Sequence, residues 1–205
     1  MNSVYDFLIE PIGKVYDNSI KVDDKELVLN TSIEKFKFVN NKAKVVSIPL
    51  AFKTPIQVGD EIIVHHNIFR RYYDLKGKEK NSSKFFKDNL YFCQVDQIYL
   101  YKKNNKWKSF NNRCFVMPLK NNNELELEEE QKLIGILKYG NSSLEALEIS
   151  EGDMVGFTPN SEFEFIVNND RLYCMKSNDI VIKYEQQKNQ TEYNPSWAKS
   201  SWRIN

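Results

Sequence analysis

An internal repeat of about ninety residues constrains the fold of this chain more than any other feature of the sequence. Residues 56–64 and residues 149–157 each carry a Gly-Asp pair directly before an alternating apolar run. Glycine adopts backbone angles that other residues resist, and an aspartate side chain can bond to the neighbouring backbone, so each pair indicates a turn before a strand. The sequence therefore predicts two consecutive copies of one small unit.

Both copies end in a similar pair of strands, because residues 90–100 match residues 172–182. In the first copy, Gly59 of the turn and Ile98 of the closing strand are 39 positions apart. In the second copy, the equivalent residues Gly152 and Ile180 are 28 positions apart. The first copy therefore carries about 11 extra residues, placed between positions 65 and 89.

Two further matches lie upstream of the Gly-Asp turns. Residues 43–48 match residues 132–137, and residues 18–22 match residues 113–117. Short β-branched and aromatic runs separated by Asn, Asp, Gly and Pro are typical of a sandwich or a small barrel. No stretch shows the period of a helix, so we expect an all-β fold.

A length of 205 residues allows two domains of about 100 residues each, close to the commonest domain size. The polar stretch at residues 102–110 is the expected linker. We therefore predict a first domain at residues 1–104 and a second at residues 105–205.

The charges of the chain are nearly balanced, with a formal net charge of +1, so no global field attracts nucleic acid or an anionic membrane. Three cysteines without close pairing, Cys93, Cys114 and Cys174, favour a reducing compartment over a disulfide framework. The N-terminus lacks the pattern of a signal peptide, and no apolar run approaches the roughly 20 residues that span a bilayer. We expect a cytoplasmic protein.

Each copy contains a strand, a long polar loop, a second strand, a Gly-Asp turn with its strand, a hairpin and a closing pair of strands. This order resembles that of the GroES-type co-chaperonins, whose subunit is a small β-barrel. Residues 151–155 look like the "VGD" strand of that family, and residues 170–184 look like its closing segment. The resemblance covers roughly residues 14–185 in two copies. With its two copies, the chain resembles in particular the divergent tandem co-chaperonins that bacteriophages carry. This resemblance implies two tandem GroES-like β-barrels, in the host cytoplasm if the protein is viral.

The resemblance also implies a function without catalysis or a cofactor: capping a chaperonin ring of the GroEL type, whose ATPase drives folding. In the family, a mobile loop carries an aliphatic anchor that docks on the ring. Leu27, Val28 and Leu29, within the loop at residues 23–41, look like that anchor. The glycines of the family loop are absent here, however, and residues 33–38 alternate like an ordered strand. The tripeptide could instead be a core strand.

The expected anchor implies an oligomer. The second-copy loop at residues 120–131 is acidic and lacks such a tripeptide, so we expect one docking loop per chain. Burying three aliphatic side chains gains roughly 5–8 kcal/mol, at about 1.5–3 kcal/mol each. Ordering five loop residues costs a similar sum, at about 1–2 kcal/mol each. One loop therefore binds weakly, whereas a ring of identical copies binds well through effective concentration.

The extra segment of the first copy interleaves basic and aromatic residues, beginning with Phe69, Arg70, Arg71, Tyr72 and Tyr73. Such a pattern can stack bases and neutralise phosphates in single-stranded nucleic acid. It is equally typical of a long hairpin whose aromatic side chains pack on their own barrel or on a neighbouring subunit. We favour the second interpretation and do not expect nucleic acid as a partner.

No other motif predicts a site of reaction. His65 and His66 are adjacent, and on a strand they would point to opposite faces, so we expect no metal site. No phosphate-binding loop or nucleophile motif is present, and we expect no enzyme. The aromatic tail at residues 193–202 either contacts a partner or folds back on its own domain. A structural or assembly role, for example in a virion, is the alternative function.

Overall fold

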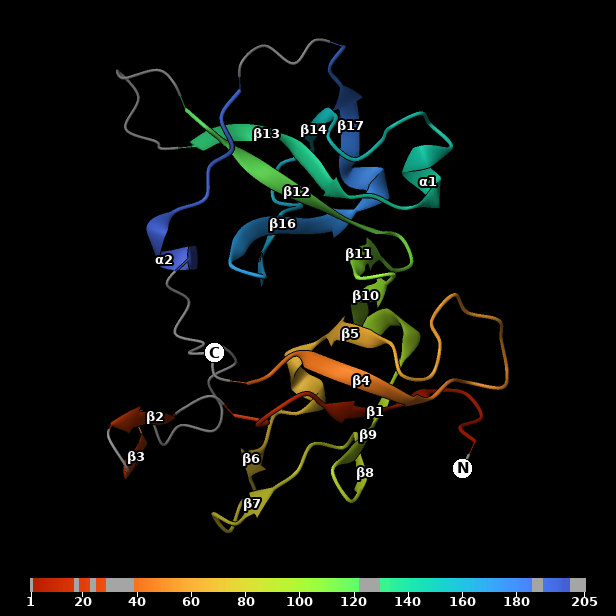
Figure 1. The fold of residues 1–205 in the computed structure, drawn as a ribbon, viewed down its shortest axis with the longest axis vertical. Helices are drawn as coiled ribbons and strands as arrows, with labels where there is room; N and C mark the ends of the chain where they lie inside the picture. The colour runs from red at the N-terminus through yellow and green to blue at the C-terminus, as the bar shows by residue number, and fades with distance from the viewer. Residues whose placement is uncertain are drawn as a thin grey trace. The chain divides into compact units, whose positions relative to one another are not determined.

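The structure is a computed structural model that describes residues 2–16, 19–22, 25–28, 39–121, 130–185 and 190–199. At residues 19–22, residues 25–28 and Lys199, only the backbone is described. The chain divides into two compact units, Met1–Trp107 and Lys108–Asn205. Each unit is built around its own β-sheet (Figure 1).

The first unit contains a seven-stranded sheet in the order β11-β10-β5-β4-β1-β9-β8. Its strands are β1 (Phe7–Pro11), β4 (Lys42–Ser47), β5 (Glu61–Val64), β8 (Phe85–Lys87), β9 (Leu90–Cys93), β10 (Ile98–Lys103) and β11 (Lys106–Ser109). Two small hairpins lie outside this sheet, formed by β2 (Ser19–Val22) with β3 (Lys25–Val28) and by β6 (Tyr72–Tyr73) with β7 (Glu79–Lys80). Short 3-10 turns are η2 (His66–Ile68) and η3 (Val95–Gln97).

The second unit contains a six-stranded sheet in the order β15-β16-β12-β13-β14-β17. Its strands are β12 (Arg113–Lys120), β13 (Glu130–Tyr139), β14 (Met154–Phe157), β15 (Phe163–Val167), β16 (Asp170–Lys176) and β17 (Ile180–Lys183). The remaining elements are short: α1 (Ser142–Glu145), η4 (Ser177–Asp179) and α2 (Ser196–Lys199).

Six strands occur in the same order in both units. The order β8-β9-β1-β4-β5-β10 of the first sheet has the same chain connections as β15-β16-β12-β13-β14-β17 of the second. The all-β prediction is therefore confirmed. Among the residues that the structure describes, neither sheet closes on itself, so the barrel closure that we expected from the resemblance is not seen.

The Gly-Asp turns are equivalent down to single hydrogen bonds. The backbone N–H of Gly59 donates to the carbonyl of Val45, and that of Gly152 donates to the carbonyl of Leu137, both at 2.8 Å. The two glycines have φ angles of +93° and +96°, a region that L side chains rarely adopt. The turn chemistry inferred from the sequence thus positions the second and third strands of each unit.

The upstream matches predicted from the sequence are wrong in two places. The sequence match paired β2 with β12, but β2 lies outside the main sheet. The true counterpart of β12 is β1, because Pro11 of β1 pairs with Ala43 in the same way as Pro118 of β12 pairs with Gly135. The match of β4 to β13 is also displaced by three positions. Between its pairs with Pro118 and Lys120, β13 carries three more residues than β12, and this bulge shifts the register.

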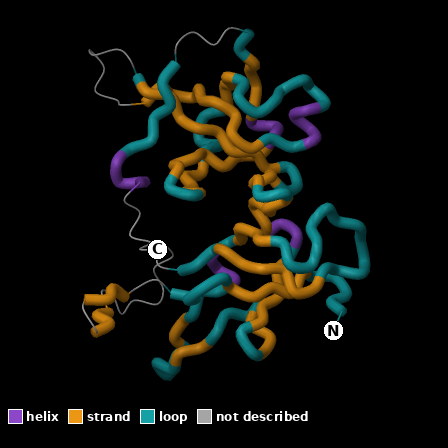
Figure 2. The backbone as a smooth tube through the Cα atoms, in the orientation of Figure 1, coloured by secondary structure: helices purple, strands orange, loops and turns teal. Residues whose placement is uncertain are grey.

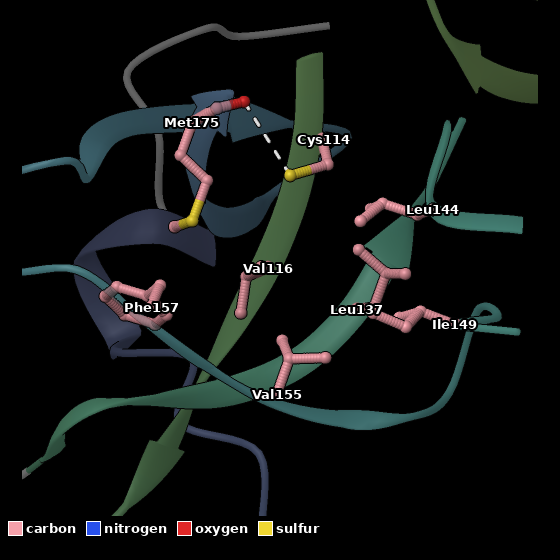
Figure 3. Close-up of a cluster of buried hydrophobic side chains, with 8 residues drawn as sticks. All are labelled: Cys114, Val116, Leu137, Leu144, Ile149, Val155, Phe157 and Met175. Carbon is pink, nitrogen blue, oxygen red and sulfur yellow. Dashed lines mark hydrogen bonds between the residues drawn. The ribbon is translucent and has the colours of Figure 1, made fainter. Parts of the chain in front are cut away.

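A cluster of buried apolar side chains fills the second unit between its strands and α1 (Figure 3). Its members come from four strands and from the connection that contains α1: Cys114, Val116, Leu137, Leu144, Ile149, Val155, Phe157 and Met175. The first unit has its own core, with Phe7, Ile9, Ile62, Phe69 and Leu100 fully buried. Each such side chain contributes about 1.5–3 kcal/mol by leaving water, so burial is the main stabilisation of both units.

The predicted linker at residues 102–110 contains the turn and second strand of the β10–β11 hairpin. Strands β10 and β11 are neighbours in the sheet, and Asn104 and Asn105 between them have φ angles of 50° and 62°. Asparagine tolerates these angles, which a two-residue hairpin turn of this hand requires. Trp107 on β11 is buried beneath the Lys102 ammonium, which lies 5.8 Å from its ring centre.

Candidate functional site

The loop of greatest functional interest connects β1 to β4 and contains the β2–β3 hairpin. Leu27 and Val28 lie on β3, where they pair with Ile20 and Ser19 of β2, and Leu29 lies outside the described residues. Among the described strands, β2 and β3 pair with each other and not with the seven-stranded sheet (Figure 2). Neither residue is therefore part of a strand of the main sheet, which was one of the two roles considered.

The base of this loop is fixed by Asn40. Its side-chain nitrogen donates to the carbonyls of Ile12 and Lys14, at 2.7 and 3.0 Å, while its side-chain oxygen accepts from the backbone N–H of Lys42 at 2.8 Å. One amide group thus closes both ends of the loop against each other. The two ends of the loop are therefore joined where the loop leaves the sheet; residues 12–16 and 39–42 are called the neck of the loop.

Tyr16 and Val39 form the next level of the neck. They make an antiparallel bridge and are both buried. The hydroxyl oxygen of Tyr16 accepts a 2.6 Å hydrogen bond from the backbone N–H of Arg71, and the Arg71 guanidinium lies 5.6 Å from the Tyr16 ring centre. Burial raises the pKa of Tyr16 above its ordinary value of 10.0. The structure thus brings the neck of the anchor loop against the extra segment of the first copy.

The basic-aromatic segment divides into a buried and an exposed part. Phe69 is fully buried and packs edge-on against Tyr91, with ring centres 4.9 Å apart. Arg71 forms an ion pair with Glu79 at 2.9 Å. Tyr72 and Tyr73, on β6, remain 47% and 49% exposed. The five residues that we grouped from the sequence therefore do not form one surface: Phe69 belongs to the core and the two tyrosines to an exposed hairpin.

The orientation that we expected for the two histidines is wrong. His65 caps the 3-10 turn η2, accepting from the backbone N–H of Asn67 at its Nδ1, and the rings of His65 and His66 stack with centres 4.4 Å apart. The chain leaves the strand at this point, so the alternation of strand side chains does not apply. Within the described residues, no group of three or more His, Cys, Asp or Glu side chains could hold a metal ion.

In the second unit, the C-terminal segment occupies the base of the equivalent loop. Residues 122–129 of that loop lie outside the described residues. The backbone N–H of Lys120 donates to Thr191, and that of Tyr193 donates to Pro118, at 2.7 and 2.8 Å. Farther along, the Asn194 side chain donates to the carbonyl of Asn169 at 3.1 Å. The segment at residues 190–199 therefore folds back on its own unit, one of the two alternatives for the tail.

An ionic network that the sequence pattern did not reveal surrounds Arg171 of β16. Its guanidinium donates to Glu130 at 2.5 Å and to Glu164 at 2.8 Å, and lies 5.8 Å from the ring centre of Trp197. The Tyr173 hydroxyl donates to Glu130 at 2.5 Å. Burial and this hydrogen bond raise the pKa of Tyr173. Only the strand register brings these residues together, since Glu130 and Arg171 are 41 positions apart.

A cavity of about 620 Å³ lies beside this network, between the start of β13 and the β14–β15 connection. Leu133, Phe157 and Tyr173 line its apolar side and Glu162 its acidic side. The Oε2 atom of Glu162 is buried and has no hydrogen-bond donor among the described residues. The polar part of the lining also includes Glu130 and Lys132.

The three cysteines are buried and unpaired. Burial raises the pKa of Cys114 to about 12 and that of Cys174 to about 11, and raises that of Cys93 as well. The thiol of Cys114 contacts the carbonyl of Met175 at 3.7 Å (Figure 3). Because the thiolate is the reactive form, these side chains act as small apolar groups of the core.

Comparison with models of known protein families gave no match, and comparison with curated protein sequences gave none either. No helix in the described part of the chain has the length and apolar character needed to span a membrane.

Proposed function

We propose that the chain is a tandem co-chaperonin of the GroES type, which caps a chaperonin ring and assists folding driven by the partner's ATPase. In this proposal each open sheet is one GroES-like barrel unit. The observation that carries it is the position of the β2–β3 hairpin. It leaves the repeated sheet between the first and second strands of the first copy, where the family carries its docking anchor, and presents Leu27 and Val28 outside that sheet.

The closed neck supports this role. Asn40 joins the two ends of the loop, and Tyr16 and Val39 fix them to the buried part of the unit. A docking segment on a fixed neck loses less freedom on binding than one on an open loop, because part of its chain is already ordered. Three aliphatic side chains per copy then suffice if several copies bind one ring together.

The edges of the sheets support association of copies. β17 ends the six-stranded order, whereas its counterpart β10 is covered by β11. Val181 and Ile182 of β17 are 57% and 49% exposed. A strand with unpaired backbone groups and exposed β-branched residues pairs readily with another chain. We propose a second copy of this chain as its partner. A structural or assembly protein that uses the same edge is the second candidate function.

The deciding experiment is a pull-down of the full chain with a purified GroEL-type chaperonin, with and without adenine nucleotide. The proposal predicts nucleotide-dependent capture of wild type and loss of capture in Leu27→Ser/Leu29→Ser. The matched control is Lys21→Ser/Lys25→Ser on the same hairpin, which should be captured like wild type.

Thermal melting of the same variants separates loss of docking from loss of folding. A docking anchor contributes nothing to its own core, so the melting temperature should not change. If the serines instead open cavities in a core, each should cost about 2–5 kcal/mol and lower it strongly. Self-association without chaperonin capture would favour the assembly role. A monomer in sedimentation at micromolar concentration would contradict both functions.

A further inference from the structure

The β6–β7 hairpin and its flanking residues form an exposed basic segment in a chain that is nearly neutral as a whole. Residues 70–87 contain seven Lys and Arg residues and two acidic residues, a local balance of +5 in a chain of net charge +1. A concentration of one sign on a short hairpin creates a local field even where the global field is absent. The field favours a polyanionic partner.

Both acidic residues of the hairpin are engaged within it. Asp74 accepts hydrogen bonds from the backbone N–H groups of Lys76 and Lys78, each at 2.9 Å, and so shapes the turn. Glu79 is paired with Arg71. In the described part of the chain no ion pair joins an acid to the other cations of the segment: Arg70, Lys76, Lys78, Lys80, Lys84 and Lys87. Among them, the exposed cations are Lys76, Lys78, Lys80 and Lys87, and their charge is available to a partner.

The same hairpin exposes aromatic rings beside these cations. Tyr72 lies directly opposite Lys80 in the two-stranded sheet, so the two side chains share one face. Tyr73, its neighbour on β6, lies on the other face, opposite Glu79. Both tyrosines are about half exposed, and Leu75 in the turn is fully exposed. A ring and a cation side by side provide stacking for a base and neutralisation for its phosphate.

We infer that the β6–β7 hairpin binds single-stranded nucleic acid, with Tyr72 stacking on a base and Lys78 and Lys80 contacting phosphates. This reverses the preference drawn from the sequence. The packing interpretation expected the aromatic residues to be at least partly covered by their own barrel or by a neighbouring subunit; Phe69 is fully buried, whereas Tyr72 and Tyr73 remain about half exposed. The inference is independent of chaperonin capping, because the hairpin and the β2–β3 anchor are separate segments.

An acidic protein is disfavoured as the partner by the tyrosines. Charge attraction alone would recruit any polyanion, but exposed rings add affinity for unstacked bases, which a duplex keeps in its stack and a polypeptide lacks. The surface therefore discriminates in the order single strand, duplex, acidic polypeptide. We therefore expect affinity to decrease from single-stranded nucleic acid to duplex to acidic polypeptide.

Fluorescence anisotropy of the full chain with a labelled oligothymidylate tests the binding. With about three to five phosphate contacts, the logarithm of affinity should fall with the logarithm of salt concentration at a slope of about −2 to −3.5. Tyr72→Ala/Tyr73→Ala should weaken binding at least about tenfold with little change of slope, because stacking releases no counterions. Lys78→Ala/Lys80→Ala should reduce the magnitude of the slope by about 1.4.

The matched control is Lys106→Ala/Lys108→Ala, which removes two exposed lysines from strand β11 and should leave binding and slope unchanged. Circular dichroism melting checks that all variants fold. Absence of binding at 50 mM salt would overturn the inference. So would equal binding of duplex or polyglutamate, or a tyrosine variant that binds like wild type, since each would leave only non-specific charge attraction.

Discussion

The backbone N–H of Arg71 donates a 2.6 Å hydrogen bond to the hydroxyl oxygen of Tyr16, across 55 residues of sequence. This bond joins the two features that distinguish the first copy from the second. Tyr16 lies at the neck of the anchor loop, and Arg71 begins the basic hairpin. The two elaborations therefore share one attachment point, although their proposed partners differ.

Tyr16→Phe should lower the free energy of unfolding by about 0.5–1.5 kcal/mol, since the ring remains and only the acceptor for Arg71 is lost. Urea unfolding followed by circular dichroism measures this change. The amide of Arg71 should also exchange faster with solvent. Tyr73→Phe, on the exposed hairpin, is the control and should leave the stability unchanged. An equal loss in both variants would contradict a structural role for the Tyr16 hydroxyl.

Gly59→Ala and Gly152→Ala should each destabilise only their own unit, by about 1–2 kcal/mol. No atom lies within 4 Å of the added methyl group at either position, so the cost is the positive φ angle alone. Hydrogen exchange resolved along the chain separates the two units. Destabilisation spread over both units would show that they do not unfold separately.

Part of this architecture could be predicted from local sequence and part could not. The Gly-Asp turns and the closing strands carry residues that encode their own conformation, so both copies were recognised. The role of β1 was missed because Phe7–Pro11 has no turn motif of its own, and the bulge in β13 is set by the pairing of Lys120 with Glu130. Contacts such as Tyr16 with Arg71 depend on the three-dimensional fold, which no short pattern specifies.

Acid should destabilise the first unit through His66. Burial, the adjacent His65 and the Arg70 charge lower the pKa of His66 from 6.5 to about 4. The unfolded chain therefore takes up this proton first, and the free energy of unfolding should fall as the pH drops from about 6.5 to about 4. Unfolding measured across this range in wild type and His66→Gln gives the contribution as a difference. Parallel curves would contradict it.

The cysteines should be unreactive in the folded protein. With each thiol buried and its pKa raised, a disulfide reagent at pH 8 should label Cys93, Cys114 and Cys174 only as the structure opens. Ser83→Cys places a thiol at an exposed position and should react within seconds. Absorbance of the released thiolate follows both reactions. Rapid labelling of wild type without denaturant would be inconsistent with the burial of the three thiols, of which Figure 3 shows Cys114.

The order of strands in the first sheet determines when each strand can pair during synthesis. β1 lies between β4 and β9, and Phe7 pairs with Cys93. One edge of β1 therefore cannot pair with β9 until almost the whole unit has left the ribosome. At about 5–20 residues per second, that delay is roughly 5–20 seconds. During this interval the edge of β1 that pairs with β9 has no partner strand, so we expect the nascent first unit to be prone to pairing with other chains until β9 is synthesised.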